Sequence, residues 1–373
     1  MEDTFDTIVI GGGIVGASTA YHLASTGVDT VLIDRNDDGR ATSAGAGILS
    51  PATSSRTADD DWFAFATDAV AYYPTLQERL ERDGASETSY RRQGAIAVAI
   101  DDDELEPYAD ARARIRDRDL DYIEEIDPAD AVNRFPALEE PRRAFYNPTA
   151  GRVDGRAFAE SLLEAGRTHG LTTIDGEVEN LQMSSDGVSG VETAGGTHID
   201  AGNIVIAGGA WSPAFGAQLD VEIPVEPQRG QVAHLTLPET DTSAWPIVGG
   251  FRHHYIVPWP DGRIVLGATR ESEVGFDPTL TAQGVNEVLT EGLRVAPGLT
   301  DATLEELRVG LRPVSADGLP ILGAVPNVDG AYVATGHGAT GLMLGPYSGK
   351  IISDAITGTS AAIPPSLSVT RLE

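Results

Sequence analysis

Residues 7–16 read TIVIGGGIVG, where an apolar, β-branched run leads directly into three glycines and a second apolar segment. This order predicts a strand, a tight turn and the start of a helix. Gly11 permits the turn, Gly13 lets the backbone approach a pyrophosphate, and Gly16 lets the helix pack closely on the strand. The free N–H groups at the start of that helix favour phosphate binding.

Residues 30–34 read TVLID and predict the next strand, which ends in an acid. Asp34 follows the glycines by about 20 residues, a spacing that places its carboxylate to accept a hydrogen bond from a ribose hydroxyl. Strand, helix and acid together predict a dinucleotide-binding domain. The alternative is a glycine-rich turn in an α/β domain that binds no nucleotide.

Glycine-rich segments follow predicted strands at three distant places, residues 11–16, 207–210 and 336–341. A ligand that is contacted at all three implies a discontinuous nucleotide domain. The intervening segments then form a second domain, and 373 residues are enough for two separate cores.

Local patterns predict individual elements along the chain. They rest on hydrophobic periodicity, on capping residues and on turn residues. The expected elements are a helix from about 60 to 82, a short helix from 128 to 135 with Asp127 as N-cap, a helix from 155 to about 168 with Asp154 as N-cap, a hairpin of residues 255–258 and 263–268, and a final helix over about 345–357.

The formal net charge is −31, and acids cluster at residues 59–61, 101–104 and 124–125. Such a charge repels nucleic acid, so a DNA or RNA partner is not expected. The acids are spread along a chain of ordinary hydrophobic content, whereas a disordered acidic tail would collect them in one block. We therefore expect a salt-adapted surface and a halophilic source rather than an ordinary solvated surface.

The chain has no cysteine, which excludes disulfides, iron–sulfur clusters, thiolate zinc sites and a cysteinyl flavin link. His253 and His254 are adjacent in a predicted strand and would point to opposite faces, so no metal site is expected. No apolar run reaches the length of a membrane span, and no signal peptide precedes the first strand. A cytoplasmic location is expected.

The ordered set of motifs resembles the FAD-dependent D-amino acid oxidase family, with glycine oxidases nearest and D-amino acid dehydrogenases sharing much of it. No single motif is decisive, but together they extend over nearly the whole chain. The motifs are residues 9–16, 39–49, 151–154, 206–212, 255–269, 310–313 with 317–318, and 336–341.

The resemblance implies an α/β fold of the GR2-type FAD-binding flavoproteins, with a discontinuous Rossmann-like domain and a substrate domain built on a mixed sheet. The expected FAD-binding domain comprises residues 1–85, 146–220 and 311–373. The expected substrate-binding domain comprises residues 86–145 and 221–310.

The resemblance also implies non-covalent FAD contacts, which agree with the residue patterns at the glycine turn, at Asp34 and in the small-residue segment. Val178 comes from the resemblance alone, and His337 either tunes the flavin or only hydrogen-bonds backbone. The expected cofactor-binding residues are Gly11, Gly13, Ile14, Val15, Gly16, Asp34, Arg35, Ala41, Thr42, Ser43, Ala46, Gly47, Ile48, Val178, Gly208, His337, Gly338, Ala339, Thr340, Gly341, Leu342 and Met343.

Arg312 matches the family's arginine that binds the substrate carboxylate, for which a planar, permanently charged guanidinium is suited. Its alternative is a structural ion pair. Tyr255 matches the tyrosine that hydrogen-bonds the carboxylate or covers the site, and its alternative is a plain strand tyrosine. Two residues depart from glycine oxidase, namely Ala339 in place of an arginine and Arg270 in place of an apolar residue. Arg270 either binds an acidic substrate group or pairs with Glu271 or Glu273 at the surface.

The implied reaction moves a hydride from the substrate Cα to flavin N5, after which the imino acid hydrolyses in water. The expected partners are a small amine or amino acid and either O2 or another electron carrier. A homo-oligomer is left open. The alternatives are a D-amino acid dehydrogenase that reduces a quinone or other carrier, a 2-hydroxy acid oxidoreductase, and a nucleotide-binding sensor without turnover.

Overall fold

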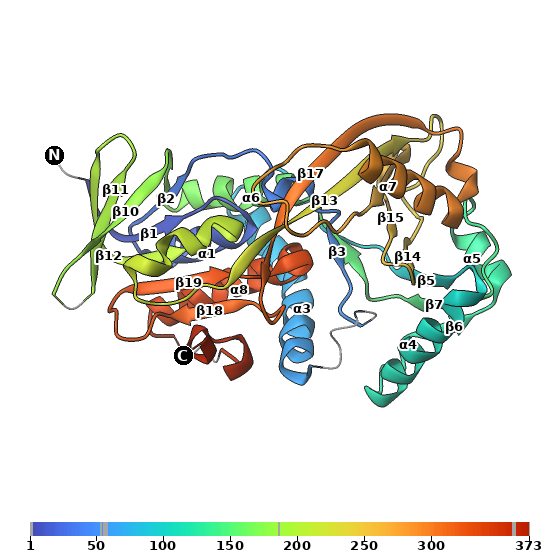
Figure 1. The fold of residues 1–373 in the computed structure, drawn as a ribbon, viewed down its shortest axis with the longest axis horizontal. Coiled ribbons are helices and arrows are strands. Elements are labelled where there is room, and N and C mark those ends of the chain that lie inside the picture. The colour runs from blue at the N-terminus through green and yellow to red at the C-terminus, as the bar shows by residue number, and fades with distance from the viewer. Residues whose placement is uncertain (1–2, 53, 55–58, 186, 360–362, 373) are drawn as a thin grey trace.

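The computed structural model describes residues 3–52, 54, 59–185, 187–359 and 363–372 and contains two eight-stranded sheets at opposite ends of an elongated molecule (Figure 1). The first sheet is built from β1 (Asp3–Ile10), β2 (Thr30–Asp34), β9 (Thr172–Asp175), β10 (Val178–Met183), β11 (Val188–Thr193), β12 (His198–Ile206), β18 (Ile321–Ala324) and β19 (Ala331–Thr335).

The parallel part of this sheet runs β9-β2-β1-β12-β19, and β18 pairs antiparallel with β19. The β10-β11 hairpin and β19 lie on the same edge of β12. Strand β11 pairs with residues 198–200 of β12, and β19 pairs with residues 204–206. Strands from the N-terminal, middle and C-terminal thirds of the chain therefore lie side by side, which confirms the expected Rossmann-like sheet assembled from distant segments.

Successive residues of the central strands enter two different hydrophobic clusters. Ile8 and Ile10 of β1 pack on one face of the sheet, whereas Val9 packs on the other, and β2 and β12 alternate in the same way. Because side chains of a strand alternate with a period of two, a strand that is buried on both faces reads as a continuous apolar run.

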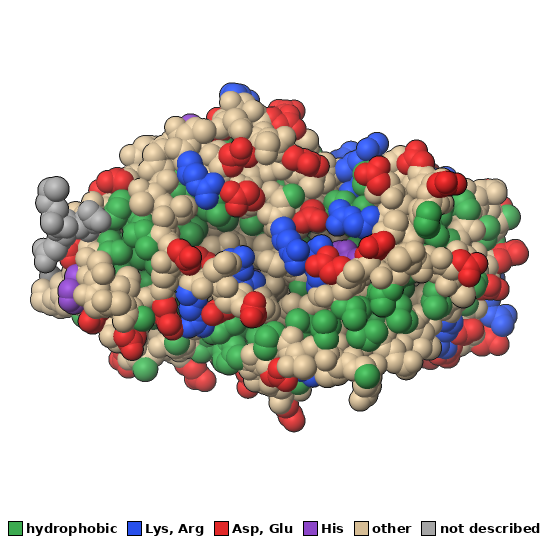
Figure 2. Space-filling model, turned by 90° about the horizontal axis from the view of Figure 1, so that it is seen from above, with side chains coloured by type: hydrophobic (Ala, Val, Ile, Leu, Met, Phe, Trp, Pro, Cys, Tyr) green, Lys and Arg blue, Asp and Glu red, His purple; other side chains and the backbone are tan. Residues whose placement is uncertain are grey.

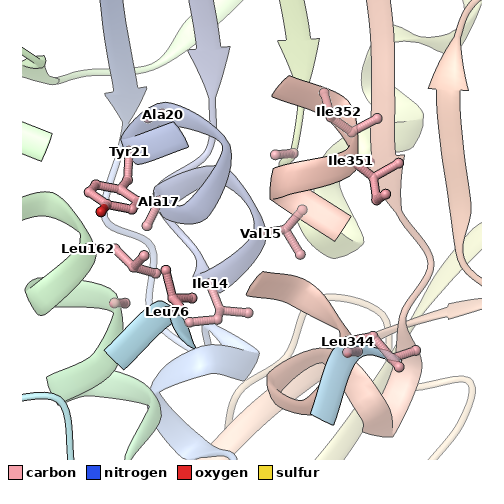
Figure 3. Close-up of a cluster of buried hydrophobic side chains, with 14 of the residues drawn as sticks. Ile14, Val15, Ala17, Ala20, Tyr21, Leu76, Leu162, Leu344, Ile351 and Ile352 are labelled. Atoms are coloured by element: carbon pink, nitrogen blue, oxygen red, sulfur yellow. The ribbon is translucent and has the colours of Figure 1, made fainter. Parts of the chain in front are cut away.

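Four helices cover one face, namely α1 (Ile14–Ser25), α3 (Asp60–Arg82), α6 (Gly155–Thr168) and α8 (Gly341–Ile356). Figure 3 shows Ile14 beside Leu76 and Leu162, and Val15 pointing to α8. Small residues such as Ala17 let α1 pack closely between its neighbours. This fixes the first turn of α1, where the glycine segment ends.

The capping residues behave differently at two helices. Asp154 accepts hydrogen bonds from the backbone N–H groups of Arg156 (3.0 Å) and Ala157 (3.3 Å), which confirms it as the N-cap of α6. Asp127 precedes α5 (Pro128–Arg134), but its side chain makes no capping hydrogen bond. The N-cap position of Asp127 and the proline at the first helical residue are as predicted.

Helix α8 begins at residue 341, four residues before the expected start, with Pro346 inside it. A proline cannot donate to the carbonyl four residues earlier, which here belongs to Leu342. The Tyr73 hydroxyl donates to that carbonyl instead. A tertiary contact from α3 thus satisfies the acceptor that proline leaves free, and local sequence gives no sign of it.

The second sheet runs β17-β13-β16-β15-β14-β5-β7-β6, with β14 and β5 parallel and the other pairs antiparallel. Its strands are β5 (Ala95–Ala99), β6 (Glu124–Ile126), β7 (Arg143–Asn147), β13 (Val225–Thr236), β14 (Ile247–Gly250), β15 (Tyr255–Pro258), β16 (Arg263–Gly267) and β17 (Thr303–Ser315), and α4 (Leu105–Asp117) and α7 (Ala282–Val295) belong to the same half. This is the mixed sheet expected for the second half of the molecule.

The small sheet β3-β8-β4 (Ile48–Leu49, Gly151–Arg152, Arg91–Arg92) completes the fold. The expected domain boundaries at 145/146 and 310/311 fall inside β7 and β17, and both strands belong to the second sheet. A strand pattern in the sequence does not reveal which sheet the strand joins, so the division of the chain into two domains stays a prediction.

Acidic side chains are spread over the face seen in Figure 2 rather than collected in one patch, and basic side chains gather near its middle. Within the described ranges, no helix is both long enough and apolar enough to cross a bilayer.

Candidate functional site

A cavity of about 380 Å³ lies where the two sheets meet. Its lining comes from the ends of β1, β2, β12 and β19, from the short helix α2 (Ala41–Ala44), and from β13, β15 and β17. Its volume is in the range of roughly 300–1,000 Å³ that is typical of small-molecule sites. The three glycine-rich segments of the sequence therefore converge on one cavity, as expected.

The glycine turn leaves no room for side chains. Gly11 has a φ of +105°, and an added Cβ would lie 2.6 Å from the carbonyl oxygen of Ala207. A Cβ on Gly16 would lie 1.8 Å from the carbonyl oxygen of Gly11. Gly16 thus acts in the close packing of α1 on β1, as predicted, and does not line the cavity.

Asp34 lies at the end of β2 and lines the cavity. One carboxylate oxygen accepts from the backbone N–H of Gly12, and the other accepts from Asn36 N (2.7 Å) and from Arg40 Nη1 (3.0 Å). A carboxylate has about four acceptor positions, so one remains for a ligand hydroxyl. These contacts orient the carboxylate before any ligand binds.

The small-residue segment closes around the same space. Thr42 Oγ1 accepts from the backbone N–H of Ile14 (3.0 Å), which joins α2 to the start of α1. Gly47 has a φ of +76°, and its Cβ would lie 1.7 Å from the carbonyl oxygen of Val153. The backbone donors, the acid and the small residues fit a dinucleotide, because they let the backbone approach a pyrophosphate closely.

Two aromatic residues to which the sequence analysis assigned no role stack on each other beside Arg35. Trp211 lines the cavity, and the Arg35 guanidinium lies over its ring at 5.6 Å from the centroid. Phe276, which is 51% exposed, stacks on Trp211 with a centroid distance of 5.4 Å. Arg35 also pairs with Asp37 and Glu177. The signal available in the sequence was the position of Trp211 directly after a glycine-rich strand end.

Arg312 on β17 and Tyr255 on β15 lie together at the other end of the cavity. Arg312 Nη1 donates to the carbonyl oxygen of Thr269 (2.9 Å) and to Gln228 Oε1 (3.4 Å), and the guanidinium also hydrogen-bonds Tyr255. Burial lowers the pKa of Arg312 and raises the pKa of Tyr255. Arg312 therefore has no structural ion pair with an acid among the described residues, and its charge faces the cavity.

Two glycines make room for this pair of side chains. A Cβ on Gly230 of β13 would lie 2.3 Å from Arg312 Nη2 and 2.5 Å from Arg312 Cζ. A Cβ on Gly267 of β16 would lie 2.5 Å from the ring of Tyr255. Sequence reasoning missed both glycines, because a glycine in a strand gives no indication of which side chain lies against it.

Arg270 also lines the cavity and is exposed at its edge. Its neighbour Glu271 is occupied elsewhere, since that carboxylate accepts from Arg229 Nη2 (2.7 Å), Gln231 Nε2 (2.6 Å) and Thr269 Oγ1 (2.7 Å). The expected surface pairing of Arg270 with Glu271 or Glu273 is thus wrong for the described part of the chain. The positive charge of Arg270 contributes to lowering the pKa of Arg312.

His337 is buried at the turn before η6 (Gly338–Thr340). Ser348 Oγ donates to the carbonyl oxygen of Leu344 (3.0 Å), so the contact between His337 Nε2 and Ser348 Oγ (2.9 Å) assigns the proton to Nε2. Burial lowers the pKa of His337 to about 4, and the ring is neutral at neutral pH.

Most of the expected cofactor-binding residues line the cavity. Besides Gly16, the exceptions are Thr340, the core residue Met343, and Ser43, which lines a neighbouring hollow of about 860 Å³. The residues in the cavity are Gly11, Gly13, Ile14, Val15, Asp34, Arg35, Ala41, Thr42, Ala46, Gly47, Ile48, Val178, Gly208, His337, Gly338, Ala339, Gly341 and Leu342. The described residues contain no group of three or more acids or histidines placed to hold a metal ion.

Comparison with known proteins supports this arrangement over the whole chain. The pattern of the family described as FAD dependent oxidoreductase (DAO) matches residues 6–355. An uncharacterized oxidoreductase, YurR, of Bacillus subtilis (strain 168) is 39% identical over 354 residues, which is 94% of each chain. A glycine oxidase of Pseudomonas putida (strain KT2440) is 30% identical over 367 residues, which is 96% of each.

The fold is also that of a solved structure. Iminodiacetate oxidase from Chelativorans sp. BNC1 superimposes with a TM-score of 0.91 at 38% sequence identity, covering 97% of this chain and 98% of that one. The likeness includes both halves of the molecule and therefore both walls of the cavity.

Proposed function

This chain belongs to the FAD dependent oxidoreductase family, and we propose that it oxidatively deaminates a small amine that carries a carboxylate, such as a D-amino acid or a glycine-like amine. The observation that carries the proposal is the Arg312 guanidinium beside Tyr255 at the end of the cavity opposite Asp34. The names of the similar proteins, glycine oxidase and iminodiacetate oxidase, support the same class of substrate.

FAD is the cofactor of this family, and when bound it accepts two electrons and a hydrogen from the substrate carbon at flavin N5. We assign its pyrophosphate to the N–H groups of the glycine turn and its ribose hydroxyl to Asp34. The small residues of α2 and the segment 45–48 would pack along it. The zero cysteine content supports a non-covalent complex.

Arg312 would bind the substrate carboxylate with two parallel N–H donors. Its remaining contacts to the Thr269 carbonyl and to Gln228 hold the guanidinium plane, and Gly230 lets that plane lie flat on β13. Tyr255 would donate its hydroxyl proton to the same carboxylate, since burial raises its pKa and keeps it protonated. These hydrogen bonds to the carboxylate would point the substrate Cα–H bond into the cavity. Such positioning lowers the activation barrier of the oxidation by several kcal/mol.

The balanced reaction needs no base from the protein when the amine binds in its neutral form. Oxidation would break the Cα–H bond of the bound amine, with FAD as the acceptor of that hydrogen and its electron pair, while the nitrogen lone pair would form the C=N bond and an N–H proton would go to solvent. Water then adds to that carbon and the C–N bond breaks, which gives a 2-oxo acid and ammonia or an amine.

The electron acceptor belongs to the same proposal, and O2 is the first candidate because the similar proteins with named activities are oxidases. A dehydrogenase that reduces a quinone or other carrier is the alternative. A cytoplasmic location and a homo-oligomer stay predictions.

An anaerobic titration tests the proposal. The purified yellow protein is mixed without oxygen with glycine, sarcosine, D-alanine, iminodiacetate and, as the competing class, a 2-hydroxy acid. Bleaching of the flavin by an amine, with a 2-oxo acid formed in equal amount, is the expected result. Rapid return of the colour on admission of air identifies an oxidase, and slow return identifies a dehydrogenase. Bleaching by the hydroxy acid alone would overturn the proposal.

A further inference from the structure

The two ends of the cavity differ in charge. The acidic lining residues lie at and just after the end of β2 (Asp34 and Asp37), in the turn between β9 and β10 (Glu177), and at the start of β10 (Glu179). In the part of the chain that the structure describes, the lining from β13, β15, β17 and residue 270 contributes two arginines and no acid. The substrate end is therefore positively charged in a protein whose net charge is −31.

Of the four arginines in the cavity, two form ion pairs with acids and two do not. Arg35 is ion-paired with Asp37 and Glu177, and Arg40 with Asp34. For Arg270 and Arg312, the described residues supply no acid within ion-pairing distance. Two guanidinium groups without an acid between them repel each other, and a ligand that carries negative charge at both relieves that repulsion.

Their placement differs in depth. Arg312 is half-buried and held by the Thr269 carbonyl at 2.9 Å, whereas Arg270 follows Thr269 directly in the chain and is exposed at the edge of the cavity. Glu271 is turned to the other side and held by Arg229 and Gln231, so it does not compete for Arg270. A substrate whose single carboxylate binds Arg312 would leave the positive charge of Arg270 without a negative partner.

We propose that the substrate is an amine with two carboxylates, one held by Arg312 inside the cavity and the second by Arg270 at its edge. This inference rests on the function proposed above, because it takes Arg312 as the first carboxylate site. The second carboxylate is carried either on the nitrogen substituent, as in iminodiacetate, or on the side chain, as in D-aspartate. Both present the same chemistry to Arg270, and the assay separates them.

The test measures binding and turnover in the FAD-loaded protein. Dissociation constants come from the change in flavin absorbance on titration with malonate and succinate, which have two carboxylates and no amine, and with acetate and propionate. Values of kcat/KM are compared for iminodiacetate and D-aspartate against sarcosine and D-alanine. The variants are Arg270→Gln and Arg270→Glu. The matched control is Arg112→Gln, because Arg112 is an arginine on α4 that is 64% exposed and does not line the cavity.

For the unchanged protein and the control variant, affinity and kcat/KM should be about tenfold or more higher for compounds with two carboxylates than for those with one. This is the effect expected of one charge-assisted hydrogen-bonded pair. Arg270→Gln should bring the preference to within about threefold of unity, and Arg270→Glu should invert it, as expected for a change of sign. Higher turnover with iminodiacetate than with D-aspartate places the second carboxylate on nitrogen, and the reverse places it on the side chain.

Equal affinity for both classes of acid, or a preference that Arg270→Gln leaves unchanged, would overturn the inference and leave the amine oxidase proposal standing. Failure of every amine to bleach the flavin would instead overturn the proposed function, and the titration with malonate and succinate would still decide what Arg270 binds.

Discussion

Gly230→Ala tests the geometry of the carboxylate site without removing any charged group. Gly230 lies in β13, opposite Gly310 of β17, and its φ is not in the left-handed region. Alanine is therefore acceptable to the backbone. The added Cβ would lie 2.3 Å from Arg312 Nη2, whereas Cβ atoms essentially never approach another heavy atom more closely than 3.0 Å.

The guanidinium is the far end of a flexible side chain, so it moves rather than the strand. It must withdraw by about 0.7 Å, the difference between 2.3 and 3.0 Å, and its hydrogen bond to the Thr269 carbonyl must change with it. A misplacement of this size costs up to about a hundredfold in rate, or about 2.7 kcal/mol. We expect kcat/KM for the best amine to fall between tenfold and a hundredfold, with FAD content and folding retained.

The matched control is Gly249→Ala in β14 of the same sheet, where an added Cβ meets no heavy atom within 4 Å. Steady-state kinetics, flavin absorbance and thermal unfolding are measured for both variants, together with inhibition by acetate. A Gly230→Ala variant that keeps both kcat/KM and acetate affinity within about threefold of the control would refute the reasoning. It would show that substrate is not held by the Arg312 guanidinium in the position described.

Arg312→Ala should lower kcat/KM by several orders of magnitude with FAD still bound, and Arg312→Lys should restore only part, because a point charge lacks the guanidinium fork; near-normal kinetics would contradict the carboxylate site. Acid or heat precipitation should release all of the FAD into the supernatant, and colour that stays with the pellet would show a covalent link. The melting temperature should rise from low to molar KCl, because salt shortens the Debye length to roughly 3 Å at 1 M and screens a net charge of −31; a flat or falling curve would argue against a salt-adapted surface. Burial lowers the pKa of His22 to about 3, so the unfolded chain binds the extra proton and stability should fall as pH drops from about 6.5 toward 3, by up to about 1.4 kcal/mol per pH unit. Urea unfolding of His22→Gln across this range should show a shallower pH dependence than the unchanged protein, and an equal slope would exclude the contribution.

Local sequence was sufficient where short-range physics decides the structure. The β1–α1 turn followed from three glycines, since only glycine fits a φ of +105° against the Ala207 carbonyl. The cap at Asp154 followed from its own side chain, which reaches N–H groups two and three residues later. Strands β1 and β2 followed from their apolar, β-branched runs.

Prediction failed where a distant segment supplies the deciding partner. In the first turns of α8, the Tyr73 hydroxyl donates to the Leu342 carbonyl in place of the N–H that Pro346 lacks. The membership of β7 and β17 in the second sheet depends on pairing with distant strands, which their own residues do not reveal. The stacking of Phe276 on Trp211 joins residues 65 positions apart and leaves no local pattern.

The sequence by itself predicted a dinucleotide-binding sheet from its glycine turn and the acid that follows. Its resemblance to the D-amino acid oxidase family predicted that Arg312 and Tyr255 act in one site, and both line the same cavity. Only the tertiary structure decided how that site is charged and shaped. Glu271 turns to Arg229 and leaves Arg270 to the cavity, and Gly230 admits the Arg312 plane. Which acid reaches which arginine, and which side chain lies against a glycine, depends on strand pairing across dozens of residues, and no local spacing encodes that pairing.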